Sequence, residues 1–202
     1  MDLTRRSFAT GMLALPGCTA LNALSDASAP RDTFALQPVE MPRSARRSAR
    51  TLLVLEPQAA AAVSTDRILI REEALAVTYL PDARWAQELP AMLQMIVVQS
   101  LASTGAFGFV GPQGAGPVPD AVVLMRLDAF GAERGPDGQF SLRVAYDVTI
   151  LRDRDQRVLG TRRFQEQEPI ADDRTGTIVQ GFQSVLETLL PETVDWITRL
   201  AA

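Results

Sequence analysis

The chain has no histidine, no lysine and a single cysteine, Cys18. Without histidine it has no Ser-His-Asp or Cys-His catalytic machinery, no imidazole metal ligand and no histidine general base. With one cysteine it forms no internal disulfide and no thiolate metal site. Most common catalytic solutions are therefore excluded, and we expect a non-enzymatic protein without a cofactor or a metal site.

Carboxylate chemistry is the main enzymatic route that remains formally open. Acidic residues are paired in three places, each beside arginines or at a predicted turn: Glu72-Glu73, Asp153 with Asp155, and Asp172-Asp173. Solvent-exposed turn charges explain all three pairs. A hydrolase that uses carboxylates or a serine stays as an alternative, and it requires two acids to converge in a pocket with raised pKa values.

The only cysteine follows a short apolar segment near the start of the chain. This segment, residues 8–17, is about half the roughly 20 residues that a membrane-spanning helix needs, and Arg5 and Arg6 precede it. A basic start and a short apolar stretch are typical of a cleavable export signal. Residues 4–8 also resemble the twin-arginine export pattern, but all 20 basic residues are arginine, so the general secretory route stays open.

The residues around the cysteine resemble the lipobox of bacterial lipoproteins. Leu15, Gly17 and Cys18 match the lipobox, whereas Pro16 departs from the usual small residue. We predict a signal peptide over 1–17, cleavage between Gly17 and Cys18, and acylation of Cys18. The alternative is a buried free cysteine, which requires residues 1–17 to belong to the fold although Pro16-Gly17 would break a helix there.

Residues 18–32 are predicted to form a flexible tether. Residues 19–31 are rich in Ala, Ser and Asn without periodicity, and at about 3.3 Å per residue they would reach roughly 40 Å. Without Asp2, Arg5 and Arg6 the remaining chain carries 18 arginines and 23 acidic residues, so we expect no binding to nucleic acid.

Local charge departs from this acidic average in residues 31–50. Five arginines face two acidic residues there, close in sequence to the predicted anchor. Two interpretations remain: a solvated loop, or attraction to anionic lipid headgroups worth about 1 kcal/mol per well-placed charge.

The remaining chain, 33–202, predicts one α+β domain. Apolar residues at helical spacing indicate a helix over 89–101, opened by Pro90 and capped by Gly105, and a closing helix over about 174–200 that Pro191 kinks or divides. A short helical turn is expected over 58–63, and Pro81 is expected to end a strand. Strands are predicted at 33–36, 51–55, 67–71, 74–80, 121–132, 140–151 and 157–166. The fold class is α+β, with a largely antiparallel sheet and both helices packed on one face.

The order of short motifs along this domain resembles the ABC-type transport auxiliary lipoprotein family, which includes the lipoprotein of the paraquat-inducible (Pqi) system. The motifs are TFAL at 33–36, LLVLEP at 52–57, TDRI at 65–68, YLPDARW at 79–85, LP at 89–90, GAF at 105–107, RRF at 162–164 and VDW at 194–196. The segment from 83 to 85 with the following helix is the most specific part.

The resemblance implies a lipid-anchored periplasmic component of an ABC transporter that carries a mammalian-cell-entry (MCE) protein and moves phospholipids or other hydrophobic molecules between the inner and outer membranes. Its partners would be the MCE-domain protein and the permease and ATPase of that system. Thr19 after the cysteine favours the outer membrane over the inner. An outer-membrane assembly lipoprotein that supports lipopolysaccharide or cell-wall machinery is the alternative, and a homo-oligomer stays open.

The expected partner contacts are Tyr79, Arg84 and Trp85, together with the loop 111–120. For Trp85 the competing interpretation is packing in the hydrophobic core, because a large apolar ring buries well. Trp196 is expected in the core.

Overall fold

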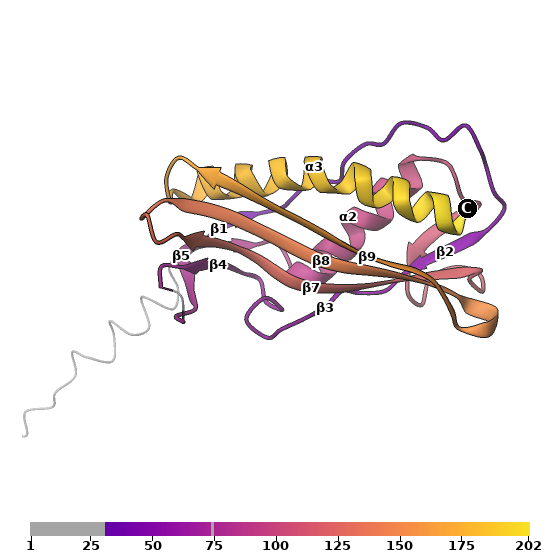
Figure 1. Ribbon diagram of the computed structural model, residues 1–202, viewed down its shortest axis with the longest axis horizontal. Helices are drawn as coiled ribbons and strands as arrows, with labels where there is room; N and C mark the ends of the chain where they lie inside the picture. The colour runs from indigo at the N-terminus through magenta and orange to yellow at the C-terminus, as the bar shows by residue number, and fades with distance from the viewer. Residues whose placement is uncertain (1–30, 74) are drawn as a thin grey trace, which may run out of the picture. The chain divides into compact units, whose positions relative to one another are not determined.

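The computed structural model describes residues 31–73 and 75–202 (Figure 1). The predicted signal peptide with Gly17, the predicted lipidation site Cys18 and the predicted tether up to residue 30 lie outside the described residues. The elements, in chain order, are β1 (Asp32–Phe34), β2 (Thr51–Val54), β3 (Gln58–Ala59), β4 (Arg67–Arg71), β5 (Thr78–Trp85), α2 (Leu89–Ser103), β6 (Phe109–Pro112), β7 (Ala121–Arg134), β8 (Phe140–Arg152), the 3-10 helix η1 (Asp153–Asp155), β9 (Arg157–Ile170) and α3 (Thr175–Ala201).

The nine described strands form one mixed sheet, which corrects the expectation of a largely antiparallel one. β7, β8 and β9 make the predicted antiparallel meander. The other edge of β7 pairs in parallel with β2 at its start, β3 in its middle and β4 at its end. Parallel pairing requires crossover connections. The alternation of side chains along a strand does not report which neighbour the strand pairs with, so the sequence did not show this arrangement.

Both helices pack on the same face of the sheet, as predicted, and contact each other. The meander turns alternate side chains toward them: Val123, Met125, Leu127, Phe130 and Ala132 on β7 pair in register with Ile150, Val148, Tyr146, Val144 and Leu142 on β8, and all ten are buried. At about 25 cal/mol per Å² of apolar area removed from water, this face is the main source of stability. The opposite face of the meander is polar.

The predicted helix at 89–101 is confirmed as α2. Pro90 stands in the first turn, where its missing N–H costs no internal hydrogen bond. The helix ends at Ser103, and Gly105 follows in the left-handed region with φ of 63°, where a side chain would be strained. A buried Thr104 completes this end, because its Oγ1 donates to the carbonyl of Leu101 at 2.6 Å.

The closing helix α3 runs continuously through Pro191, so the expectation that the proline divides it is wrong. The carbonyl of Glu187, which loses its N–H partner, belongs to an exposed residue, whereas Leu189, Leu190 and Val194 around the proline are buried. Packing therefore holds the helix together across the missing bond. Gly181 lets α3 approach the sheet closely, because a Cβ there would lie 2.4 Å from Cδ1 of Leu142.

Two further local expectations need correction. β5 does not end at Pro81 but continues to Trp85. Its register with β4 shifts between Tyr79 and Arg84, so the proline falls in an irregular stretch where no ladder hydrogen bond depends on its nitrogen. The helical turn expected over 58–63 is confirmed only in its second half. Residues 58–59 form β3, which pairs with Arg126 and Leu127 of β7, whereas the N–H groups of Val63 and Ser64 both donate to the carbonyl of Ala60.

A buried hydrogen-bond chain joins the sheet to α3. The Tyr146 hydroxyl donates to Oγ1 of Thr193 at 2.8 Å, and this Oγ1 donates to the carbonyl of Leu189 at 2.9 Å. Burial raises the pKa of Tyr146 well above its ordinary value of about 10. The folded protein therefore keeps this proton at pH values where the unfolded chain releases it.

We predict that stability declines as pH rises above about 10, because the unfolded chain then binds fewer protons than the folded one. Tyr146→Phe should cost about 1 kcal/mol at neutral pH through the lost hydrogen bond and should flatten the alkaline decline. The chain has no lysine or histidine whose titration would add to this alkaline decline in stability. Urea unfolding at several pH values from neutral to above 10 measures it; equal alkaline slopes in both proteins would contradict the prediction.

Candidate interaction surfaces

The structure separates the three predicted contact residues. Trp85 is 2% exposed and belongs to the core, so its side chain is not available to a partner, which corrects that expectation. Its ring meets Phe130 edge-on at 6.2 Å and Phe182 at 5.8 Å, and these two phenylalanines stack at 4.4 Å between centroids. Trp196 is partly buried against the same core and meets Phe164 edge-on.

On the part of the sheet formed by β1, β5 and β4, Tyr79 is half-buried against the core and Arg84 is exposed. The Arg67 guanidinium lies 4.3 Å above the Tyr79 ring, and the Tyr79 hydroxyl donates to the carbonyl of Ala62 at 3.1 Å. Arg84 is exposed, and its Nε donates to Thr33 Oγ1 at 3.3 Å. Local contacts thus hold both side chains in place while leaving surface free.

The turn between β4 and β5 carries apolar side chains that the sequence placed in a half-buried strand. β5 begins only at Thr78, and Leu75 and Val77 are 99% and 41% exposed. Exposed large apolar side chains grouped beside polar ones are typical of interaction sites. We call Leu75, Val77, Tyr79 and Arg84 the hairpin surface. An apolar run that the fold leaves uncovered was the signal that sequence reasoning missed.

An extended segment, residues 37–50, runs along the helices from the middle of α3 to its C-terminal end. Backbone N–H groups of the segment donate hydrogen bonds to both helices and to the residues that follow α2. Gln37 donates to Gln183 Oε1 on α3, and Val39 and Met41 donate to the hydroxyls of Ser100 and Ser103 on α2. Ser44 and Ser48 donate to the carbonyls of Thr104 and Ala106. At its end Arg50 donates to the carbonyls of Ala201 and Ala202 at 3.1 and 3.3 Å, where the helix dipole favours a cation.

This path carries the arginines of the segment away from the start of the domain. Phe34 of β1 pairs with Trp85, which contacts Phe182, whereas Arg50 contacts Ala201. At 1.5 Å per helical residue the two points lie about 28 Å apart along α3. The arginines at 43–50 therefore lie toward the C-terminal end of α3, away from the point where β1 packs.

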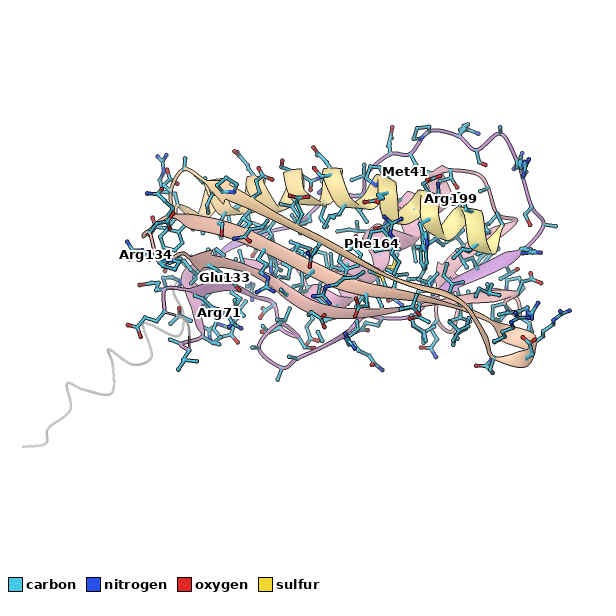
Figure 2. All side chains as sticks on the ribbon, in the orientation of Figure 1. Met41, Arg71, Glu133, Arg134, Phe164 and Arg199 are labelled. Carbon is cyan, nitrogen blue, oxygen red and sulfur yellow. The ribbon has the colours of Figure 1, made fainter. Side chains whose placement is uncertain are left out.

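Two hollows lie at this end of the domain. An open groove of about 320 Å³ between the segment and α3 is lined by Met41, Pro42, Ser44, Thr104, Pro191, Val194, Asp195 and Thr198. Its volume is at the low end of the range for small-ligand sites. Figure 2 shows Met41 and Arg199 at this end. A larger hollow of about 520 Å³ is lined by Arg50, Val118, Arg152, Arg154 and Leu200 among others, and includes part of the predicted contact loop 111–120.

Of the acidic residues singled out from the sequence, Asp155 and Asp172 accept hydrogen bonds from arginines, whereas Glu72 and Glu73 are exposed to solvent. The Arg174 guanidinium donates to Asp172 at 2.7 Å and lowers the pKa of that carboxyl to about 2. Hydrogen bonds from Arg152 lower the pKa of Asp155, and those from Arg126 and Arg163 lower the pKa of Asp128. A general acid needs the opposite shift.

Asp128 belongs to a charge network on the polar face of the meander, where Arg126 and Arg163 each pair with both Asp128 and Asp147. This network is neutral overall. Within residues 31–73 and 75–202, no three acidic or cysteine side chains gather closely enough to hold a metal ion. Neither of the described helices combines the length and apolar character needed to cross a membrane.

The model of a family described as ABC-type transport auxiliary lipoprotein component matches residues 33–193. A crystal structure of a Xanthomonas campestris protein of the DUF330 family is similar with a TM-score of 0.74 and 22% identity, over 83% of this chain and 95% of that one. The crystal structure of an uncharacterised protein has a TM-score of 0.63 and 12% identity, over 84% of this chain and 97% of that one. A hypothetical protein from Chlamydia trachomatis has a TM-score of 0.53 and 9% identity, over 77% of this chain and 99% of that one. These likenesses show a shared fold. No curated protein matches the chain.

Proposed function

This chain belongs to the ABC-type transport auxiliary lipoprotein family, and we propose from that membership that it is the non-enzymatic, lipid-anchored periplasmic component of an MCE-type ABC transporter. The transported molecules would be phospholipids or other hydrophobic molecules moving between the inner and outer membranes. A separate permease and ATPase would supply the pathway and the energy. The observation that carries the proposal is the family match over residues 33–193.

We further propose that Cys18 is acylated after removal of residues 1–17 and that residues 18–32 tether the domain to the membrane, with the outer membrane favoured by Thr19. Anchoring leaves the domain itself free to meet a partner across the periplasm. An affinity tag at its C-terminus should recover the MCE-domain protein with the permease and ATPase. Recovery of lipopolysaccharide or cell-wall assembly proteins instead would support the alternative function.

We assign the partner contact to the hairpin surface, on the exposure of Leu75 and Val77 in the turn and of Arg84 on β5, with the half-buried Tyr79 between them. Apolar side chains at the centre of an interface, surrounded by polar ones, carry most binding energy. This assignment keeps two of the three contacts predicted from the sequence and replaces the buried Trp85.

The double variant Leu75→Ser/Val77→Ser is expected to lower recovery of the MCE-domain protein at least tenfold, equivalent to about 1.4 kcal/mol. Its thermal stability should stay within about 0.5 kcal/mol of the parent, because both side chains are exposed. The measurement is co-purification at matched expression. Ala171→Ser, at an exposed apolar residue outside the hairpin surface, is the control and should leave recovery unchanged. If the hairpin variant recovered as much MCE-domain protein as the parent, the partner contact would not be at the hairpin surface.

A further inference from the structure

The end of the domain where α3 terminates combines exposed arginines with exposed valines. The arginines come from two elements: Arg43, Arg46 and Arg47 from the extended segment, and Arg154 and Arg157 from the turn between β8 and β9. Val118 and Val158 are 83% and 53% exposed beside them. The end of the extended segment meets the turn between β8 and β9, because Arg50, Val118 and Arg154 line one hollow. Figure 1 shows the segment and this turn at the end of the domain where α3 terminates. We call these seven residues the helix-end surface.

The charges on this surface are unpaired, unlike those of neighbouring arginines. Arg50 caps α3, Arg152 pairs with Asp155 at 2.9 Å, and Arg199 pairs with Asp195 at 2.8 Å. Among the described residues, no salt-bridge partner lies beside Arg43, Arg46, Arg47, Arg154 or Arg157. A protein with more acidic than basic residues thus concentrates free positive charge at one end.

Nearby acidic groups do not cancel this charge. Asp120 accepts the backbone N–H of Thr51 at 2.8 Å, and Asp155 is held by Arg152. Asp153 is the remaining acid on the turn. The free arginines therefore outnumber the free acidic side chains of this surface, and a negatively charged partner is complementary to it.

We propose that the helix-end surface docks on an anionic phospholipid membrane, in addition to the lipid anchor. The arginines are spread over two elements and do not converge on one pocket, which fits a layer of phosphate headgroups better than a single small anion. The exposed valines fit the same partner, because apolar side chains between basic ones enter the boundary between headgroups and acyl chains. Binding of a free phosphate ion would not explain why these valines are exposed.

The position of the surface gives this contact a consequence. It lies about 28 Å along α3 from the point where β1 packs. The domain would thus contact lipid through this surface as well as through the acylated cysteine proposed above. Two contacts fix the orientation of the domain, whereas a flexible tether alone leaves it free to rotate. The inference rests on the proposed envelope location but requires none of the transporter partners.

The test uses the full chain carrying Cys18→Ser, which removes the acylated thiol, and vesicles of equimolar phosphatidylglycerol and phosphatidylcholine. We expect binding to these vesicles and much weaker binding to phosphatidylcholine alone. Arg46→Gln/Arg47→Gln and Arg154→Gln/Arg157→Gln should each weaken binding roughly 25-fold, at about fivefold per arginine near the surface. Val118→Ser/Val158→Ser should also weaken it.

Arg134→Gln/Arg174→Gln is the matched control, because it removes the same charge; Arg134 lies at the opposite end of the domain from Arg199 (Figure 2). It should bind as the parent does, and all variants should melt near the parent temperature. Equal weakening by this control, or equal binding to both vesicle types, would overturn the proposal. So would release by inorganic phosphate beyond that caused by chloride of the same ionic strength, because it would indicate a small-anion site. Co-purification with the transporter is unaffected by these outcomes, so the two proposals fail separately.

Discussion

Replacing Cys18 with alanine is expected to move the protein from the membrane fraction to the soluble periplasmic fraction or to leave an uncleaved precursor. Each buried CH₂ of an acyl chain contributes about 0.8 kcal/mol, and a single chain gives only marginal binding, so stable attachment requires more than one chain on the cysteine. Loss of the thiol removes all of them at once. The measurement is fractionation of cells, with a high-salt wash that removes electrostatically bound protein from the membranes, followed by mass spectrometry of the mature N-terminus.

Ser25→Ala is the control for this experiment, because it changes another small residue of the predicted tether without touching the lipobox. It should fractionate and be processed as the parent. A Cys18→Ala protein that is processed normally and stays in the membrane fraction would contradict both the acylation and the anchoring role. The helix-end surface would then have to be tested as the sole attachment.

The helices and the meander were the parts of the fold that local sequence patterns predicted well. The helix at 89–101 and the strands at 121–132 and 140–151 agree with α2, β7 and β8, because short turns and strict side-chain periodicity determine them locally. β9 extends to Ile170, beyond the predicted end at 166, because it pairs with β8 over its whole length.

The parts that could not be predicted depend on contacts distant in sequence. β3 forms because residues 58–59 pair with the edge of β7. The sequence of residues 58–59 does not predict this pairing. Pro191 remains helical because the residues around it are buried against the sheet, and Pro81 sits in a strand because the register of β5 shifts there. Propensity is overruled in each case by tertiary packing.

The same reason explains the mixed outcome for the candidate site. An apolar alternation at 74–80 predicted burial, but the turn between β4 and β5 leaves Leu75 and Val77 uncovered. In contrast, Trp85 belongs to the most specific motif and was predicted as a contact, but its ring fills the core, as the competing interpretation expected. The exposure of a side chain depends on how the sheet assembles, so a sequence motif alone does not predict it.

Trp85→Ala is therefore expected to destabilise the domain by about 3–5 kcal/mol, because it removes a fully buried ring and leaves a cavity beside Phe130 and Phe182. For a domain of this size the melting temperature should fall by roughly 10 °C. Thermal unfolding followed by circular dichroism measures the change. Leu75→Ala is the control, and its melting temperature should stay close to that of the parent.

Trp85→Phe separates the core role from a contact role. It keeps an aromatic ring in the cluster, so the domain should remain folded at working temperature with a smaller loss of stability than in the alanine variant. Partner recovery by this variant should equal that of the parent, because the indole has almost no exposed surface to offer. A folded Trp85→Phe protein that loses the MCE-domain partner while Leu75→Ser/Val77→Ser keeps it would place the contact at the tryptophan and remove it from the hairpin surface.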